Sequence, residues 1–303
     1  MPSKQINFSP KSLTGVECLD SLVPESHSKA GLHAILGATG VGLTRIVTMI
    51  CANLGVDAMK NDERNRSVLW IGSQERLDVV REQHQNYLKA RHLPVEALSR
   101  IKFSDVNSGK PAAFGAVAEA IIDCKPNAVV IDDVEKLVQK QLKNPHSSVN
   151  ASRMMNSLLA GLSSAAMREG IPIFVTHKLK GKLGTAMPNA ILSHHDAASC
   201  KRFGEHIDTS FTVGTHSPTG LFKVSCTKPV YDRDARSAVV RLSDNGSTLK
   251  VATDKELEQF TDPTWAEPKV VVSASLIDLM QQWESESPTA YRMRRAVRLS
   301  NRK

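Results

Sequence analysis

From residue 31 onward, short apolar runs alternate with longer stretches whose apolar residues recur at helical spacing. The runs have the length of buried strands. The predicted strands cover residues 32–36, 68–72, 101–103, 128–131 and 171–176. The predicted helices cover residues 42–54, 77–90, 114–124 and 152–169. Strands that alternate with helices of this length need crossover connections, so we expect a mostly parallel sheet flanked by helices.

The pattern changes after residue 205, where short alternating segments replace the alternation of helices and strands. The predicted strands in this region cover residues 209–213, 221–226, 238–242 and 248–251. The turn residues between them are Gly220, Pro229 and the pair Asn245-Gly246. Short strands joined by such turns form antiparallel hairpins. The predicted fold class is therefore α/β, with a mostly parallel sheet that ends in antiparallel C-terminal strands.

The same pattern divides the chain into three segments. Residues 1–30 are a polar lead-in, residues 31–255 form the α/β core, and residues 256–303 are a linker, a short helix and a basic C-terminal tail. The last twelve residues hold six Arg or Lys side chains. Such a tail either binds phosphate groups or is a solvated chain end, and the sequence leaves both open.

Composition narrows the class of protein. Of 303 residues, 41% are hydrophobic and 23% are charged, which is ordinary for a folded domain. No apolar run approaches the roughly 18 residues of a membrane span, and the first residues lack the apolar stretch of a secretion signal. The five cysteines include no C-x-x-C pair, which favours a reducing compartment over disulfides or a zinc site. We therefore expect a cytoplasmic protein without a membrane partner.

The first predicted strand leads into the segment G-A-T-G-V-G-L-T, residues 37–44. It matches the P-loop pattern G-x-x-x-x-G-K-[ST] in both glycines and in Thr44, but Leu43 occupies the lysine position. Glycines let backbone N–H groups turn inward around phosphate, and the helix N-terminus adds its dipole. The expected cofactor-binding residues are Gly37, Ala38, Thr39, Gly40, Val41, Gly42, Leu43 and Thr44. The alternative is a plain glycine turn between a strand and a helix.

Carboxylates follow two of the predicted strands. Glu75 follows the strand at 68–72, where a base would orient water against a γ-phosphate; otherwise it is a solvated glutamate. Asp132 follows the buried strand at 128–131, which carries a carboxylate to the sheet edge beside the loop. We expect Thr44 and Asp132 to hold Mg²⁺, and the alternative for Asp132 is a helix cap.

Polar and basic residues follow the strand at 171–176. His177 stands where a side chain would sense the γ-phosphate, or it is a surface histidine at a strand end. The segment 178–202 has little apolar content, and a long loop of this kind is usually functional or disordered. The expected nucleic-acid-binding residues are Lys178, Lys180, Lys182, Lys201 and Arg202. The net charge of +8 fits a polyanionic partner, although many basic proteins have none.

Two further cations, Lys228 and Arg233, flank the predicted turn at Pro229-Val230-Tyr231. Cations at a hairpin tip can reach the phosphate bound by a neighbouring subunit and act there in trans. A solvated charged turn is equally compatible with the sequence. The trans-acting interpretation therefore depends on whether the chain forms an oligomer.

In this order, the segments resemble the RecA-like P-loop ATPases, most nearly the RadA-type and replicative-helicase branch that includes DnaB and plasmid RepA. The resemblance covers residues 11–252. It runs through the lead-in L-T-G-V-E-C-L-D-S-L, the loop as a degenerate Walker A, S-V-L-W-I-G-S-Q-E, N-A-V-V-I-D-D as Walker B and G-I-P-I-F-V-T-H-K. By resemblance Glu75 is the catalytic glutamate, His177 lies on the sensor strand, and Lys228 and Arg233 are the trans-acting cations.

The resemblance implies a ring or filament of identical subunits, with ATP and Mg²⁺ bound between protomers. Loops such as residues 178–202 would face single-stranded nucleic acid, with DNA as the expected form. Positive loops on successive subunits would track the phosphate backbone, which gives salt-sensitive binding with little sequence preference. The family's work is DNA replication, recombination and repair, and we expect this protein to act there.

Leu43 in place of the lysine separates two hypotheses. A lost charge-assisted hydrogen bond of about 1.5–3 kcal/mol weakens nucleotide binding by about one to two powers of ten. The favoured hypothesis is a nucleic-acid-binding protein that binds ATP and Mg²⁺ weakly or not at all. The alternative is an active DNA-stimulated ATPase, a helicase or recombinase motor in which another cation replaces the lysine. A P-loop kinase for a small acceptor ranks third, because no acceptor-binding motif is evident.

Overall fold

The computed structural model describes residues 12–23, 29–38, 40–60, 67–72, 77–104, 113–139, 148–179, 197, 202–216, 221–228, 236–243, 248–254 and 256. The chain divides into two units, residues 1–259 and 260–303, and all the described residues lie in the first. The segment boundaries predicted at residues 30 and 255 stay predictions. The predicted C-terminal helix and basic tail lie outside the described residues.

A nine-stranded sheet organises the described part of the chain, in the order β3-β2-β4-β5-β1-β6-β7-β8-β9. Its strands are β1 (Gly31–Gly37), β2 (Val68–Ile71), β3 (Ile101–Ser104), β4 (Ala128–Ile131), β5 (Pro172–Lys178), β6 (Thr209–His216), β7 (Leu221–Lys228), β8 (Arg236–Leu242) and β9 (Leu249–Val251). Strands β1 to β6 pair in parallel, and β6 to β9 pair antiparallel. The predicted fold class is confirmed.

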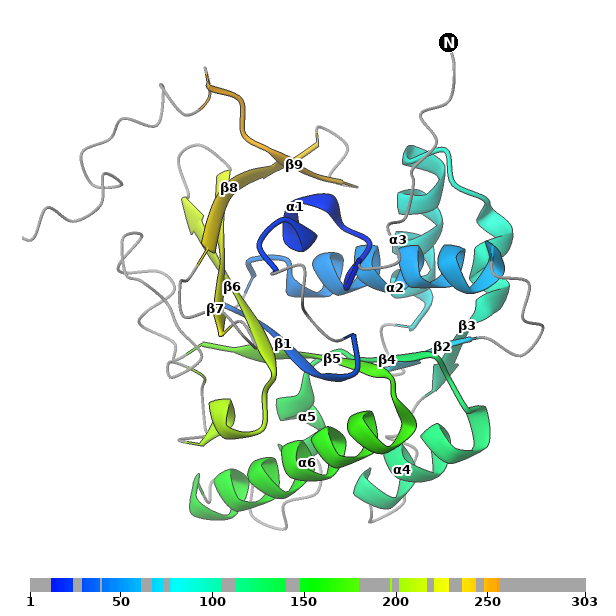
Figure 1. Ribbon diagram of the computed structural model, residues 1–303, viewed down its shortest axis with the longest axis vertical. Coiled ribbons are helices and arrows are strands. Elements are labelled where there is room, and N and C mark those ends of the chain that lie inside the picture. Colours follow the sequence, from blue (N-terminus) through cyan, green and yellow to red (C-terminus); the bar gives the residue numbers. More distant parts are fainter. Residues whose placement is uncertain are drawn as a thin grey trace, which may run out of the picture. The chain divides into compact units, whose positions relative to one another are not determined.

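Helices cover both faces of this sheet (Figure 1). The α-helices are α1 (Glu17–Asp20), α2 (Leu43–Lys60), α3 (Leu77–Ala90), α4 (Ala113–Cys124), α5 (Val134–Gln139) and α6 (Ser148–Glu169), and the 3₁₀ helices are η2 (Val95–Arg100) and η4 (Phe203–Glu205). Helices α2 and α3 lie on one face, and α4, α5 and α6 lie on the other. The described helices thus form two layers with the sheet between them.

Each face of the sheet has its own apolar core, because side chains alternate along a strand. In β5, Phe174 packs in the core under α2, whereas Ile173 and Val175 pack in the core under α6. The parallel pairing of β4, β5 and β1 also brings the carboxyl ends of these strands together at one edge. Ligands of open α/β sheets bind at that edge.

Several elements differ from the sequence prediction: α6 begins earlier than predicted, β5, β6 and β7 end later, and α1, η2 and η4 were not predicted as helices. Helix α2 continues to Lys60 instead of ending at residue 54, and Gly55 lies inside it. A Cβ at Gly55 would lie 3.2 Å from the carbonyl oxygen of Ala97, so this glycine permits the close packing of α2 on η2 and does not end the helix. The short helix α5 was not predicted. Among the described residues, no helix combines the length and the apolar character that crossing a bilayer requires.

Candidate functional site

The candidate site lies where β1, β4 and β5 end. Gly37 is the last residue of β1, and the loop that follows it leads directly into α2. Asp132 follows the last residue of β4, and Lys178 is the last residue of β5. Since these strands are neighbours in parallel register, their ends bring residues together that are far apart in the sequence. The structure thus places the glycine loop beside the carboxylate that was predicted to face it.

The loop itself carries left-handed backbone at two glycines. Gly40 has φ 87° and Gly42 has φ 89°, a conformation that only glycine adopts without strain. A Cβ at either position would meet no atom within 4 Å, so the loop is open on that side. Within the loop, the Val41 N–H donates a 3.2 Å hydrogen bond to the carbonyl oxygen of Ala38. Left-handed turns of this kind expose N–H groups to an anion.

Leu43 packs against the apolar core under α2, and its side chain is half-buried. A Cβ at Gly37 would lie 2.6 Å from Val41 Cγ1 and 2.9 Å from Leu43 Cδ2, so both side chains fold closely over this glycine. The apolar residue at the lysine position therefore stabilises the strand-to-helix connection, and it brings no charge to a phosphate.

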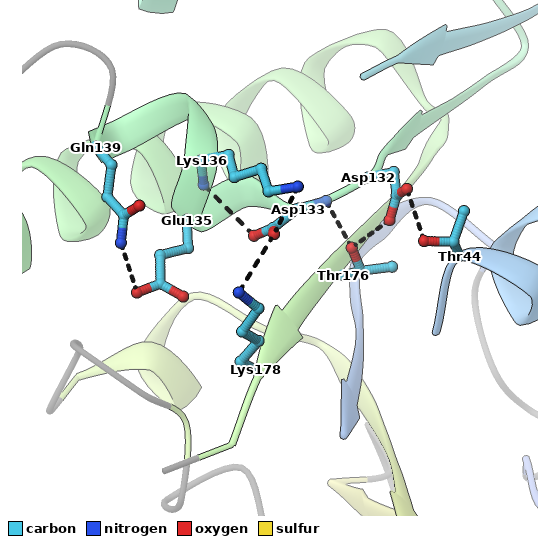
Figure 2. Close-up of polar contacts among 8 residues, drawn as sticks. All are labelled: Thr44, Asp132, Asp133, Glu135, Lys136, Gln139, Thr176 and Lys178. Carbon is cyan, nitrogen blue, oxygen red and sulfur yellow. Dashed lines mark hydrogen bonds and ion pairs between the residues drawn. The ribbon is translucent and has the colours of Figure 1, made fainter. Parts of the chain in front are cut away.

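Asp132 is the centre of a polar cluster, shown in Figure 2. The Thr44 hydroxyl donates a 3.0 Å hydrogen bond to Asp132 Oδ2, and the Thr176 hydroxyl donates a 2.9 Å hydrogen bond to Oδ1. Thr176 Oγ1 also accepts a 2.6 Å hydrogen bond from the Asp133 N–H. Both carboxylate oxygens of Asp132 are thereby fixed, one toward the helix that follows the loop and one toward β5.

Burial raises the pKa of Asp132 above its ordinary value. The hydroxyls of Thr176 and Thr44 act in the opposite direction, because each hydrogen bond favours the ionised carboxylate, while the neighbouring Asp133 raises the pKa further. A cation beside Asp132 would favour the ionised form in the same way. Mg²⁺ is usually held by one or two protein oxygens together with phosphate and water, so the Thr44 hydroxyl and the Asp132 carboxylate fit it.

His177 and its neighbour Thr176 lie on opposite faces of β5. The His177 ring is buried and stacks on Phe203, with the ring centroids 5.0 Å apart and the planes 12° apart. Phe203 belongs to the core on the α6 face, whereas Thr176 reaches Asp132. The structure therefore brings Thr176, which sequence reasoning missed, to the cluster, and it does not bring His177 there. Strand alternation counted from Phe174 could have identified Thr176.

The predicted basic residues that can be described are both ion-paired. Lys178 Nζ lies 3.8 Å from Asp133 Oδ2, as does Lys136 Nζ from α5 (Figure 2). Arg202 Nε lies 3.6 Å from Glu205 Oε1 at the surface. The predicted site residues outside the described part are Thr39, Glu75, Lys180, Lys182, Lys201 and Arg233, together with the side chain of Lys228. Within the described residues, no cluster of three or more His, Cys, Asp or Glu side chains is arranged to hold a metal ion by itself.

Comparison with known proteins identifies the fold. No protein-family model matches the chain, and no curated protein matches it. Among solved structures, the chain is similar to the RadB recombinase, with a TM-score of 0.56 and 16% sequence identity. The match covers 79% of this chain and 99% of that chain. At this identity the match shows the fold alone, which is RecA-like.

Proposed function

We propose that this protein is a RecA-like nucleic-acid-binding protein that binds nucleotide weakly at a P-loop without its lysine. The observation that carries the proposal is the 3.0 Å hydrogen bond from Thr44 to Asp132, beside a glycine loop with an open side. A buried carboxylate costs folding free energy unless it is compensated, and this one lies where a metal–phosphate complex would compensate it. A glycine turn that binds no phosphate would not need a buried carboxylate beside it.

The residues fit a nucleotide with its metal ion. The loop at residues 37–44 would hold the phosphates of ATP, and Thr44 and Asp132 would hold Mg²⁺. When bound, Mg²⁺ neutralises charge on the phosphate oxygens. Thr176 keeps the Asp132 carboxylate oriented through its hydrogen bond to Oδ1. We assign Glu75, from its place after β2, to orienting water against the γ-phosphate.

Nucleic acid is the partner that the charge distribution favours. The chain carries a net charge of +8, and the segment 178–202 begins and ends with basic residues. His177 directly precedes this segment and Phe203 directly follows it, and the two rings stack on each other. We propose that the segment binds single-stranded DNA and that Lys228 and Arg233 act in trans in a ring or filament. The setting would be cytoplasmic DNA replication, recombination or repair.

An active DNA-stimulated ATPase is the second candidate. The observation that favours it is that a hydroxyl donates to each oxygen of Asp132, because a metal-dependent phosphate reaction uses an oriented carboxylate. The observation against it is Leu43, because one missing preorganised donor costs about 2.7–4 kcal/mol in the chemical step. The two candidates therefore differ in the rate of hydrolysis and not in the architecture of the site.

The variant Leu43→Lys separates the two candidates. We expect wild-type ATP hydrolysis to be near background, and Leu43→Lys to hydrolyse ATP faster, because the added ammonium group is a donor for the chemical step. The measurement is the rate of phosphate release with and without single-stranded DNA. Rapid ATP hydrolysis by the wild type, with no faster hydrolysis in the variant, would contradict the weak-hydrolysis proposal and favour the active ATPase.

Binding of single-stranded DNA tests the other half of the proposal. A titration at two salt concentrations should show weaker binding at higher salt, because each neutralised phosphate releases condensed counterions. Arg202→Gln should reduce the salt slope by about one unit if its side chain contacts a phosphate. Binding that is absent, or that does not respond to salt, would contradict a nucleic-acid role.

A further inference from the structure

We propose that Lys178 supplies, within the same chain, the phosphate-binding cation that is missing at Leu43. The inference rests on the proposed nucleotide site and names the charge that such a site needs. Lys178 would then bind nucleotide phosphate, whereas the remaining basic residues of the segment 178–202 would bind nucleic acid. Three observations carry it: the position of Lys178 in the sheet, its side-chain direction and the charge around it.

Lys178 lies directly beside the first residue of the glycine loop. In the parallel pair β1–β5 it is opposite Gly37, and adjacent strands lie only about 4.8 Å apart. The N–H of the next residue, Leu179, donates a 3.0 Å hydrogen bond to the Gly37 carbonyl oxygen, which locks this register at the strand ends. The Lys178 backbone therefore has a fixed place next to the loop.

The direction of the Lys178 side chain follows from strand alternation. Lys178 is two residues beyond Thr176, so its side chain leaves β5 on the same face. That face is the one on which Thr176 meets Asp132 and Thr44. Figure 2 shows the Lys178 side chain running back toward Asp133, next to this cluster. The ammonium group thus stays at the strand ends where the phosphates of a nucleotide would lie.

The Lys178 ammonium group has a distant partner that it shares with another lysine. Lys178 Nζ and Lys136 Nζ each lie 3.8 Å from the same atom, Asp133 Oδ2, so two ammonium groups share one carboxylate. The charge of Lys136 also acts on Asp132, where it lowers the pKa of that carboxyl against the larger effect of burial. A separation of 3.8 Å exceeds the roughly 3.2 Å limit of a good N–H···O hydrogen bond, and the Lys178 side chain is 39% exposed. An arriving phosphate can therefore recruit it.

Other cations near the loop are less well placed. Arg45 is exposed on α2, and successive helical residues point about 100° apart, so it does not take the direction of residue 43. Lys136 shares the carboxylate of Asp133 and its charge also acts on Asp132, but it belongs to α5, whose apolar side chains pack on the opposite face of the sheet, and not to a strand beside the loop. Among the described residues, Lys178 is the cation that belongs to a strand paired with β1.

The test is a titration of ATP, ADP and AMP with Mg²⁺ into four full-length proteins: wild type, Lys178→Gln, Lys178→Arg and Lys136→Gln. The last is a matched control, because Lys136 has the same partner atom, distance and exposure as Lys178. We expect Lys178→Gln to weaken ATP binding by about tenfold to a hundredfold, Lys178→Arg to weaken it much less, and Lys136→Gln to change it little. AMP, which lacks the outer phosphates, should not distinguish the proteins.

A double variant distinguishes a loss of binding from misfolding. Adding Leu43→Lys to Lys178→Gln should restore ATP binding, which a misfolded protein could not do. Equal ATP affinity in wild type and Lys178→Gln, or an equal loss in Lys178→Gln and Lys136→Gln, would overturn the inference and leave the nucleotide site standing. Loss of single-stranded DNA binding in Lys178→Gln with unchanged ATP binding would also overturn it. No binding of ATP or ADP to wild type would instead remove the nucleotide half of the proposed function, and this inference with it.

Discussion

The two sides of the candidate nucleotide site are built from opposite kinds of side chain. On the metal side, Thr44, Asp132 and Thr176 form a closed set of hydrogen bonds around a buried carboxylate. On the phosphate side, Val41 and Leu43 fold over Gly37 and join the apolar core. The glycine loop lies between the two sides and keeps its left-handed residues.

In the proposed function, the two sides would therefore contribute different interactions to nucleotide binding. The metal side offers oriented oxygens, while the phosphate side offers backbone N–H groups without the usual lysine. The proposed site would therefore depend on Mg²⁺ and on a cation from another element for its affinity. The following variants test whether the metal side contributes mainly to ATP affinity and the apolar side mainly to the stability of the fold.

The largest expected effect is on the metal side. Asp132→Asn keeps the shape of the side chain but removes its negative charge, so Mg²⁺-dependent ATP affinity should fall by about a hundredfold or more, beyond the 10–100-fold typical of a residue that only supports a metal ligand. The measurement is ATP affinity with Mg²⁺ and with EDTA. Equal affinities in the variant and the wild type would show that Asp132 holds no metal.

Thr176→Val should have a smaller effect in the same direction. It removes the hydroxyl that orients Asp132 Oδ1 and leaves Asp132 itself in place, so we expect about a tenfold loss of Mg²⁺-dependent ATP affinity. Thr48→Val is the control, because Thr48 is also buried but donates to the backbone oxygen of Thr44. If both variants lose affinity equally, the orienting role of Thr176 is refuted.

The RecA-like arrangement of the core was readable from the sequence, and so was the pairing of Thr44 with Asp132. The strand at residues 128–131 and the helix at residues 77–90 have the predicted bounds, because their apolar pattern is unbroken and their ends are marked by polar residues. Parallel strands then bring their carboxyl ends to one edge, which predicted that Asp132 lies beside the loop.

The rest of the site depends on packing that one sequence does not reveal. Thr176 and His177 point to opposite faces of β5, and only the position of α2 shows which of these faces lies toward the loop. The inward packing of Leu43 depends on Gly37 and on the core beneath α2. The predicted helix end at residue 54 was wrong, and the role of Gly55 follows only from its close approach to Ala97.

On the apolar side, Val41→Thr tests packing without changing charge. Val41 is 5% exposed and lines a small apolar cavity with Ile46, Val213 and Phe222. A hydroxyl placed there without a partner should lower the free energy of unfolding by about 1–2 kcal/mol. Urea unfolding measures this, and the exposed Val79→Thr should show no comparable loss. An unchanged Val41→Thr would mean that the loop is not held by this core.

The pH dependence of stability distinguishes the two sides further. Because the pKa of Asp132 is raised on folding, the folded protein binds a proton more tightly than the unfolded chain does. Without Mg²⁺, the Asp132 contribution to the free energy of unfolding should therefore fall as pH rises from about 4 toward 7. Asp132→Asn lacks this step, so its stability relative to wild type should increase over that range. A constant difference across the range would contradict the raised pKa.

The most direct measurement is a structure solved with Mg²⁺ and a non-hydrolysable ATP analogue. The account predicts that the phosphates lie against the backbone of residues 37–44, that the metal lies between Thr44 Oγ1 and the Asp132 carboxylate, and that Lys178 Nζ has moved from Asp133 to a phosphate oxygen. Phosphates bound away from the loop, or a metal that does not touch Asp132, would contradict it.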